Sequence, residues 1–368
     1  MAKGVYVGVN NVARKAKNIY VGVNGIARKV KKGYVGVNGV ARLFYMSEVV
    51  FSRVSAPNLS LARQRLAATT VGNYALFGGG ATAAAASNVV DSYTNTLVKG
   101  TPEVLSAARS YLAATTVGNY ALFGGSTNGG VDSYTNTLVK GTPEVLSVPA
   151  RRAVLAATTV GNYALFGGGT NLTGTYTDVV DSYTNTLVKG TPEVLSAARS
   201  HLAATTVGNY ALFGGGRTNG DVVDSYTNTL VKGTPTPLSV ARGGVTAAVA
   251  GNYALFMGGG GDGYTISNVV DSYTNTLVKG TLTLPINRGT SAATTITDHA
   301  ILGRGHSTTA GGTSSNIIIY TPQLVATQLL DGAATGWLAA TTVGNYALFG
   351  GGNTGSAMSA FVGAFLAS

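Results

Sequence analysis

Most of the chain consists of short apolar runs separated by glycine-rich and polar turns. In residues 66–80, LAATTVGNYALFGGG, two such runs flank Gly72-Asn73. Short runs rich in Val, Thr, Tyr and Phe, bounded by Gly and Asn, predict strands joined by a tight turn. After a variable loop, residues 88–94 (NVVDSYT) and 96–101 (TLVKGT) predict a third and a fourth strand. The pattern therefore predicts four antiparallel strands in each repeating unit.

The four-strand pattern recurs along the chain. The stretch LAATTVGNYALFGG begins at Leu66 and is repeated letter for letter four more times. Its tyrosine recurs at intervals of 43 to 47 residues, with His299 at one position, and the tyrosines are Tyr74, Tyr120, Tyr163, Tyr210, Tyr253 and Tyr346. Seven such units predict an all-β fold, a seven-bladed β-propeller, because stacked blades bury faces that a single blade would expose.

The two ends of the repeat array predict how the ring closes. In the seventh unit, Phe365 stands 13 residues after Gly352, as Tyr93 stands 13 residues after Gly80, and the chain then ends without a fourth strand. Residues 49–55 precede the first unit at the place of a fourth strand. We therefore expect residues 49–55 to complete the last blade, which removes an open sheet edge.

A shorter repeat precedes the propeller. Tyr6, Tyr20 and Tyr34 each begin a 14-residue stretch of the type YVGVNGIARKVKK. The Asn-Gly in the middle of two copies favours the type I′ turn of a β-hairpin, so three hairpins are predicted. We divide the chain into an N-terminal module, residues 1–47, and a propeller, residues 48–368.

Charge separates these two parts. The chain has a net charge of +11, and residues 1–47 carry nine Lys or Arg and no Asp or Glu. The remainder is nearly balanced, with 16 basic and 14 acidic residues. The chain has no cysteine, which excludes disulfides and Cys-ligated metals. No apolar run reaches the roughly 18 residues of a spanning helix, and no secretory signal is recognisable.

The long repeat resembles the kelch motif over residues 50–368. The shared features are a strand–turn–strand that ends in Gly-Gly, an aromatic residue further along, and a fourth strand. The kelch motif carries Trp on its fourth strand, whereas this chain has leucines that can fill the gap between blades: Leu97, Leu138, Leu187, Leu230 and Leu277.

Glycine, histidine and aspartate provide no recognisable catalytic pattern. No helical pattern follows any GGG, so we interpret these glycines as closely packed strand ends and not as phosphate loops. His299 takes a packing position, and with His201 and His306 it predicts no metal site. The third-strand aspartates occur once per unit, too far apart for the carboxylate pair of a glycosidase, and we expect them to hydrogen-bond within the scaffold: Asp91, Asp132, Asp181, Asp224 and Asp271. We expect no enzyme activity and no cofactor.

Arginines stand 11 residues before the tyrosine position in six units, and Thr335 replaces the arginine in the seventh. The six are Arg63, Arg109, Arg152, Arg199, Arg242 and Arg288. At the start of the innermost strands they would ring one mouth of the central channel. The kelch resemblance implies that such arginines can contact carboxylates of an acidic ligand. The alternative is a structural ion pair with neighbours such as Glu103 or with the third-strand aspartate.

Comparison among the repeats shows where the sequence varies. The turns VGN and YTNT hardly change, whereas the loop after the glycines and the link between blades change in every unit. Alternating strand directions bring these two variable classes to one face. A constant scaffold with varied loops is typical of binding proteins, although drift after recent duplication would give the same pattern.

The basic N-terminal repeats resemble short repeats near the ends of tail and other virion proteins of phages that infect Gram-positive bacteria. Exposed hairpins can add strands to a partner's sheet, and basic residues can select an acidic partner. The docking residues that we expect are Arg14, Lys15, Lys17, Arg28, Lys29, Lys31, Lys32 and Arg42. Few aromatic residues accompany these charges, so nucleic acid is not the expected partner; a solvated basic tail is the alternative.

Together these patterns lead to one functional hypothesis. The chain is predicted to be a non-enzymatic recognition or adhesion protein of a virion or phage tail. Its N-terminal arm would dock to other virion proteins, and its propeller would bind a host-surface glycan or protein. A structural or decoration subunit and a carbohydrate-active propeller enzyme are the alternatives, as is a location on a bacterial surface. Association of several copies stays open.

Overall fold

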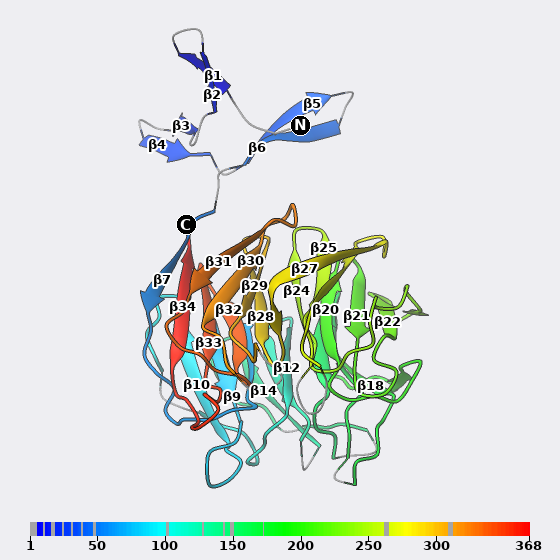
Figure 1. Cartoon of the computed structure of the whole chain (residues 1–368). Helices are drawn as coiled ribbons and strands as arrows, with labels where there is room; N and C mark the ends of the chain where they lie inside the picture. The colour runs from blue at the N-terminus through cyan, green and yellow to red at the C-terminus, as the bar shows by residue number, and fades with distance from the viewer. Residues whose placement is uncertain are drawn as a thin grey trace. The chain divides into compact units, whose positions relative to one another are not determined.

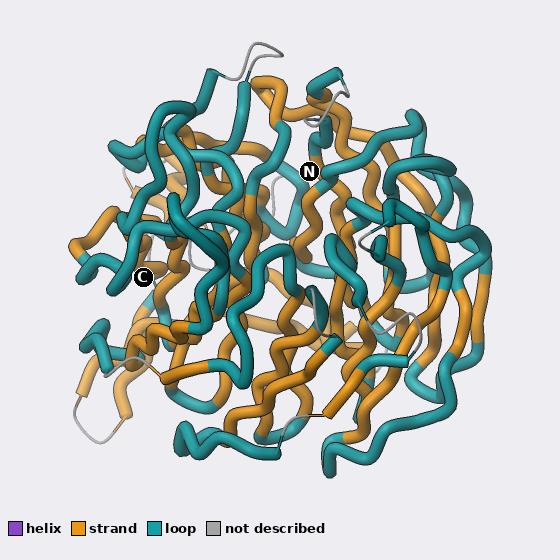
Figure 2. The backbone as a smooth tube through the Cα atoms, turned by 90° about the horizontal axis from the view of Figure 1, so that it is seen from below, coloured by secondary structure: helices purple, strands orange, loops and turns teal. Residues whose placement is uncertain are grey.

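The protein is an all-β molecule in the computed structural model, which describes residues 6–9, 12–15, 19–23, 26–30, 32–37, 40–46, 49–100, 103–126, 129–142, 144–147, 151–171, 173–260, 265–307 and 312–368. Every regular element in these ranges is a β-strand, and Figure 2 shows only strands and loops there. The contacts divide the chain into two units, Met1–Phe51 with Ser368, and Ser52–Ala367.

The larger unit is a seven-bladed β-propeller of four-stranded antiparallel sheets, as the repeats predict (Figure 1). Blades 1 to 3 are β8 (Ala67–Val71), β9 (Tyr74–Gly78), β10 (Val89–Thr94) and β11 (Glu103–Val104); β12 (Ala113–Val117), β13 (Tyr120–Gly124), β14 (Gly130–Thr135) and β15 (Glu144–Val145); β16 (Ala156–Val160), β17 (Tyr163–Gly167), β18 (Val179–Thr184) and β19 (Glu193–Val194). Blades 4 and 5 are β20 (Ala203–Val207), β21 (Tyr210–Gly214), β22 (Val223–Thr227) and β23 (Lys232–Gly233); β24 (Thr246–Ala250), β25 (Tyr253–Met257), β26 (Ser267–Thr274) and β27 (Lys279–Arg288). Blades 6 and 7 are β28 (Ala292–Ile296), β29 (His299–Gly303), β30 (Asn316–Tyr320) and β31 (Ala326–Leu330); β32 (Ala339–Val343), β33 (Tyr346–Gly350), β34 (Val362–Ala367) and β7 (Phe51–Ser55).

The seventh blade is completed by the N-terminal strand, as the sequence predicts. Strand β7 pairs with β34 at the outer edge of that sheet, and Figure 1 shows the two strands side by side. Backbone hydrogen bonds of 3.0 Å in both directions join Val50 and Ser368 just beyond this pair. The ring is thereby closed by strands from the two ends of the array, and β34 is not left as a free edge.

The first strands of the blades form the inner ring. Each lies beside the first strand of the next blade, including β32 beside β8. The repeated threonines of AATTV join these strands: hydroxyls of Thr69 and Thr116 lie 2.7 Å apart, as do those of Thr70 and Thr341. Hydrogen-bonded hydroxyls can be buried at little cost, which explains why a polar pair recurs in an otherwise apolar strand.

The core lies between adjacent blades. Between blades 1 and 2, Val71 and Val90 pack with Phe123 and Tyr134. A Cβ on Gly78 would come within 2.6 Å of the Phe123 ring, so only glycine fits there. The equivalent glycines of five other blades face the phenylalanine of the next blade in the same way: Gly124, Gly167, Gly214, Gly303 and Gly350. The interpretation of these glycines as closely packed strand ends is confirmed.

The N-terminal unit contains three separate two-stranded antiparallel sheets. They are the pairs β1 (Tyr6–Val9) with β2 (Val12–Lys15), β3 (Tyr20–Val23) with β4 (Ile26–Lys29), and β5 (Lys32–Val37) with β6 (Val40–Met46). These are the antiparallel strand pairs that the three predicted hairpins require. Their expected type I′ turns lie outside the described residues.

Candidate functional site

The six arginines that the sequence places before the innermost strands are buried, each with an exposed fraction of 2% or less. Five form ion pairs with the third-strand aspartate of the same blade, and these pairs are Arg63–Asp91, Arg109–Asp132, Arg152–Asp181, Arg199–Asp224 and Arg242–Asp271. A guanidinium group enclosed in this way cannot reach a ligand in the channel. The expectation of a ligand-binding arginine ring is therefore corrected, and the structural ion pair with the third-strand aspartate is what the structure shows.

These ion pairs fix the link between blades to the sheet that follows it. Around Asp91, the amide of Ser60 donates to Oδ1 at 3.0 Å and Nζ of Lys99 lies 3.2 Å from the same oxygen. Desolvation lowers the pKa of Arg63, and the Asp91 carboxylate opposes this shift. Because each carboxylate sits in its own blade with its own cations, no two of them form the pair that glycoside hydrolysis requires.

Two blades depart from this arrangement. In blade 6, Ile318 occupies the register position of the aspartate, opposite Leu302, and leaves Arg288 without a carboxylate partner among the described residues. Desolvation lowers the pKa of Arg288 to about 10. In blade 7 the corresponding position is Gly363, and a Cβ there would fall on the carboxylate of Asp331 and the guanidinium of Arg304.

A different set of residues lines the end of the propeller axis. Each inner strand is preceded by a leucine in five blades, by Val245 in blade 5 and by Ser291 in blade 6. The residue before this position differs in all seven blades, and we call this set the mouth ring: Arg65, Tyr111, Val154, His201, Gly244, Thr290 and Trp337. All seven have φ between +50° and +62°. Backbone hydrogen bonds of 2.8–3.0 Å run from blade to blade through the ring, for example from Tyr111 N to Arg65 O and from Arg65 N to Trp337 O.

Six of these bonds connect all seven residues, from Gly244 round to Thr290. The main chain alone therefore holds the mouth ring, and the side chains are left to differ. A left-handed φ at a non-glycine residue stores strain of about 1–3 kcal/mol. Six of the seven mouth-ring residues are not glycine and have this conformation. Such strain persists only where surrounding contacts impose it, as the series of hydrogen bonds from Gly244 to Thr290 does here.

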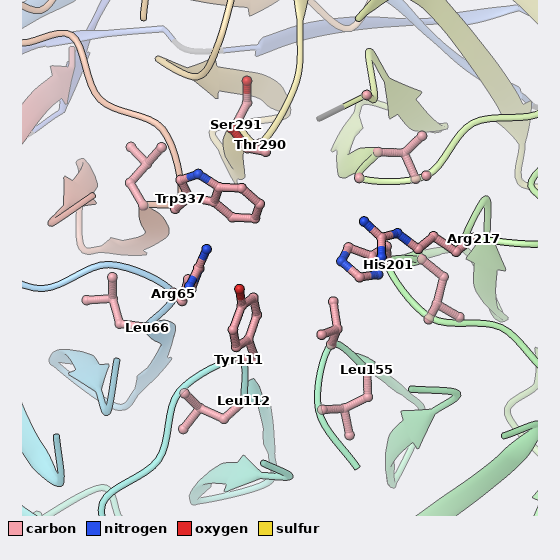
Figure 3. Close-up of a pocket in the computed structure, with 17 residues that line it drawn as sticks. Arg65, Leu66, Tyr111, Leu112, Leu155, His201, Arg217, Thr290, Ser291 and Trp337 are labelled. Carbon is pink, nitrogen blue, oxygen red and sulfur yellow. The ribbon is translucent and has the colours of Figure 1, made fainter. Parts of the chain in front are cut away.

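The mouth ring encloses a cavity of about 200 Å³, which we call the mouth cavity. Its lining combines the mouth ring with the conserved leucines beneath it, and with Arg217 and Ser291. Figure 3 shows Arg65, Tyr111 and Trp337 on one side of this cavity and His201 with Arg217 on the opposite side. The described residues that line the cavity include no Asp or Glu.

The Arg65 guanidinium is held between two aromatic rings. Its Cζ lies 4.5 Å from the centroid of Tyr111 and 4.9 Å from that of Trp337. The two rings meet edge to face, with centroids 6.5 Å apart. Nε of Arg65 is buried and has no hydrogen-bond acceptor within the described part of the chain. Cation–π contacts from both rings thus fix the orientation of this cation.

The variable loop after the glycines reaches the same end of the propeller. The backbone of Arg217 pairs with that of Ser200, next to His201, and the backbone of His306 pairs with that of Gly289, next to Thr290. Nδ1 of His306 lies 2.8 Å from the Thr290 hydroxyl. The prediction that blade links and post-glycine loops share one face is confirmed at these contacts.

The opposite face, which carries the VGN and YTNT turns, is constant for a packing reason. The backbone of Gly72 lies against Asn136 of the next blade, where an added Cβ would be 3.0 Å from the asparagine Cβ. Gly118, Gly161 and Gly208 meet the asparagine of the following blade in the same way. Each turn therefore constrains its neighbour, whereas the mouth-ring side chains project into a cavity.

The sequence-based interpretation placed the varied blade links on the face that carries the mouth ring but chose the arginines, and not this ring, as its ligand-binding residues. The buried arginines are constant, and their constancy drew attention to them. The mouth ring shows the opposite pattern: its position holds a different residue in every repeat, and it precedes a leucine that five repeats share. His201, which has no assigned role in the sequence pattern, belongs to this set.

The remaining candidates lie elsewhere. His299 is buried on β29, and its Nδ1 lies 2.7 Å from the carbonyl oxygen of Thr297. The docking candidates of the N-terminal unit are on β2 (Arg14, Lys15), β4 (Arg28, Lys29), β5 (Lys32) and β6 (Arg42), and Lys17 and Lys31 lie outside the described residues.

Within the described ranges, no group of three or more His, Asp or Glu side chains is placed to hold a metal ion. The same part of the structure contains no helix with the length and apolar character needed to cross a membrane. Comparison with protein-family models finds no match, and comparison with curated proteins finds none either. The kelch and tail-protein resemblances therefore rest on the sequence motifs alone.

Proposed function

We propose that this chain is a non-enzymatic recognition protein, in which the propeller binds a surface ligand at the mouth cavity and the basic N-terminal hairpins attach it to a larger assembly. The observation that carries the proposal is the mouth ring. Seven stations on an otherwise repeated scaffold hold seven different residues, including Arg, Tyr, His and Trp, and they surround one cavity. Large polar and aromatic side chains on a rigid frame are characteristic of ligand-binding surfaces.

The resemblance of the N-terminal repeats to those of phage tail and virion proteins makes a virion or phage tail the assembly that we propose, with the ligand on the host cell surface. Removal of residues 1–46 should leave a folded propeller that no longer joins the particle, measured by mass spectrometry of purified particles. Normal incorporation of the truncated chain would contradict the docking role of the N-terminal unit.

Binding of the full-length chain to a glycan array and to intact bacteria tests the recognition role. Trp337→Ala and Tyr111→Ala should each abolish surface binding, because they remove the two rings beside Arg65. Val139→Ala is the matched control, because Val139 is 62% exposed on an outer turn away from the mouth. If all three variants bind as the unmodified chain does, the mouth has no part in recognition. If no surface binds, a structural or decoration subunit is favoured.

A further inference from the structure

Strand β31 forms the outer edge of blade 6, and no other strand in the described ranges pairs with its outer side. Its sequence, ATQLL, contains no charged residue and no proline. Thr327, Gln328 and Leu330 are exposed, and Leu330, at 71%, is more exposed than any other large apolar residue in the described structure. An uncharged and extended edge strand is a template for pairing with another chain.

The outer edges of the other blades carry features that prevent such pairing. Strand β27 contains Pro285, and β7 contains Arg53. Blades 1 to 4 end in strands of only two residues, each with one charged residue: Glu103, Glu144, Glu193 and Lys232. Short strands, charged side chains and proline all disfavour pairing at a sheet edge. Among the outer strands that the structure describes, β31 is the one without any of these features.

The backbone register shows which groups of β31 are available at this edge. Beyond the two ends of the β30–β31 pair, Asp331 N donates to Ser315 O at 2.9 Å and Thr321 N donates to Val325 O at 3.0 Å. Hydrogen-bonded and non-hydrogen-bonded positions alternate along an antiparallel pair, so the odd-numbered residues of β31 bond to β30. The even-numbered residues turn their amide and carbonyl groups outward: Ala326, Gln328 and Leu330.

These outward groups are complementary to those of a second copy of the same strand. Antiparallel pairing about a two-fold axis at Gln328 sets this residue opposite its own copy, and sets Ala326 opposite Leu330 of the second copy. An amide side chain both donates and accepts hydrogen bonds, so glutamine can pair with glutamine. Like charges placed opposite each other are destabilising. A strand that pairs with itself must therefore lack charge at its centre, as β31 does.

We propose that two copies of this chain associate through the outer edges of blade 6, with β31 antiparallel to β31 of the second copy about a two-fold axis at Gln328. The outward amide and carbonyl groups bond across the axis, and the contact covers Leu330. The interface is smaller than a standard one of roughly 1,600 Å², so association is weak and depends on concentration. This inference goes beyond the proposed function, since it requires neither the mouth cavity nor the N-terminal hairpins.

Analytical ultracentrifugation of the full-length chain, from about 1 μM to about 0.5 mM, tests for a monomer–dimer equilibrium. Gln328→Lys should weaken self-association at least about tenfold, because two lysines then face each other. Val104→Lys is the matched control, since it adds the same charge at a 48% exposed residue on the outer edge of blade 1. A chain that stays monomeric throughout would leave the edge to a strand of another protein and overturn the proposal.

A second variant at the same position tests the two-fold axis itself. Gln328→Glu alone should also fail to associate, but an equimolar mixture of the Gln328→Lys and Gln328→Glu variants should form a dimer again, because opposite charges then meet at the axis. Recovery in the mixture also excludes a folding defect in either variant. A mixture that stays monomeric would overturn the proposed register. Unweakened self-association of Gln328→Lys would place the contact elsewhere in the chain and overturn the proposal as well.

Discussion

Asp331 accepts a hydrogen bond of 2.5 Å from Nε of Arg304, in the space that Gly363 leaves between blades 6 and 7. Five other blades take the arginine from the blade link and the aspartate from the third strand, but here the link supplies the acid and the post-glycine loop supplies the base. Arg53 of the closing strand also approaches Asp331, at 3.6 Å. The exchanged pair thus holds the blade in which the two ends of the propeller meet.

We expect Asp331→Ala to lower the free energy of unfolding by about 3–5 kcal/mol, because it leaves Arg304 buried without its counterion. The double variant Arg304→Met/Asp331→Leu should recover most of that loss, since it removes both charges. Urea-induced unfolding followed by circular dichroism measures both effects. Asp221→Ala provides the control at an exposed carboxylate. Equal losses for the single and the double variant would contradict the ion-pair argument.

The unpaired Arg288 makes a contrasting prediction. Its side chain is 1% exposed and lacks a carboxylate partner in the described structure, so its burial is unfavourable. Arg288→Met should raise the free energy of unfolding by about 1–3 kcal/mol. Arg109→Met should lower it by a similar amount or more, because Asp132 loses its buried partner. Thermal unfolding of the two variants is the measurement, and a shift of both in the same direction would show that pairing is not what separates them.

At the boundary between blades 5 and 6, two residues in contact differ from those of the other blades, one larger and one smaller. Met257 stands where other blades have the close-packed glycine, and Leu302 of the next blade stands where the others have phenylalanine. We expect Met257→Gly to lower the free energy of unfolding by about 2–5 kcal/mol through a cavity. Leu302→Phe should lower it by about 1–3 kcal/mol through overpacking.

The double variant Met257→Gly/Leu302→Phe recreates the glycine–phenylalanine contact of the other blades. Its loss should be smaller than the sum of the two single losses, with a coupling of about 0.5–3 kcal/mol. A double-mutant cycle from urea unfolding gives this coupling directly. Strict additivity would mean that the two positions do not share one packing site.

Buried tyrosines predict the response to alkaline pH. Burial, with the neighbouring aspartate, raises the pKa above its ordinary value near 10 in five third-strand tyrosines: Tyr93, Tyr134, Tyr183, Tyr226 and Tyr273. Burial alone raises the pKa of Tyr320 to about 12. The unfolded chain releases these protons near pH 10 while the folded chain still holds them. Stability is therefore full below pH 10 and falls as the pH rises above it.

Phenolate absorbance measured together with circular dichroism tests this prediction. The buried tyrosines should ionise only as the β-sheet signal is lost, after the exposed tyrosines have titrated. If every tyrosine ionises near pH 10 while the sheet signal persists, the buried hydroxyls are not held by the fold.

The architecture could be predicted because a repeat is visible in one dimension. The spacing of Tyr74 and its equivalents fixed seven blades, and the incomplete last unit predicted the closing strand at residues 49–55. Both conclusions need only the order of the elements and the rule that sheet edges are covered.

The candidate site could not be found in the same way, because its residues meet only in three dimensions. Arg63 and Asp91 are 28 positions apart, and their spacing does not show that they bury one another. A clue was present, since the unit with Thr335 in place of arginine also has Gly363 in place of aspartate. The mouth ring could be recognised in the sequence only from a position at which all seven repeats differ.

The hydrogen-bonded main chain of the mouth ring has a genetic consequence. In five blades the mouth residue is followed by the same strand, LAATTV, so a crossover between two of these copies would carry a mouth residue to another blade without altering that strand. Such an exchange would leave the fold unchanged, while the side chains around the propeller axis would differ. The uniformity of the blades thus allows the residues of the mouth ring to be rearranged while the fold is kept.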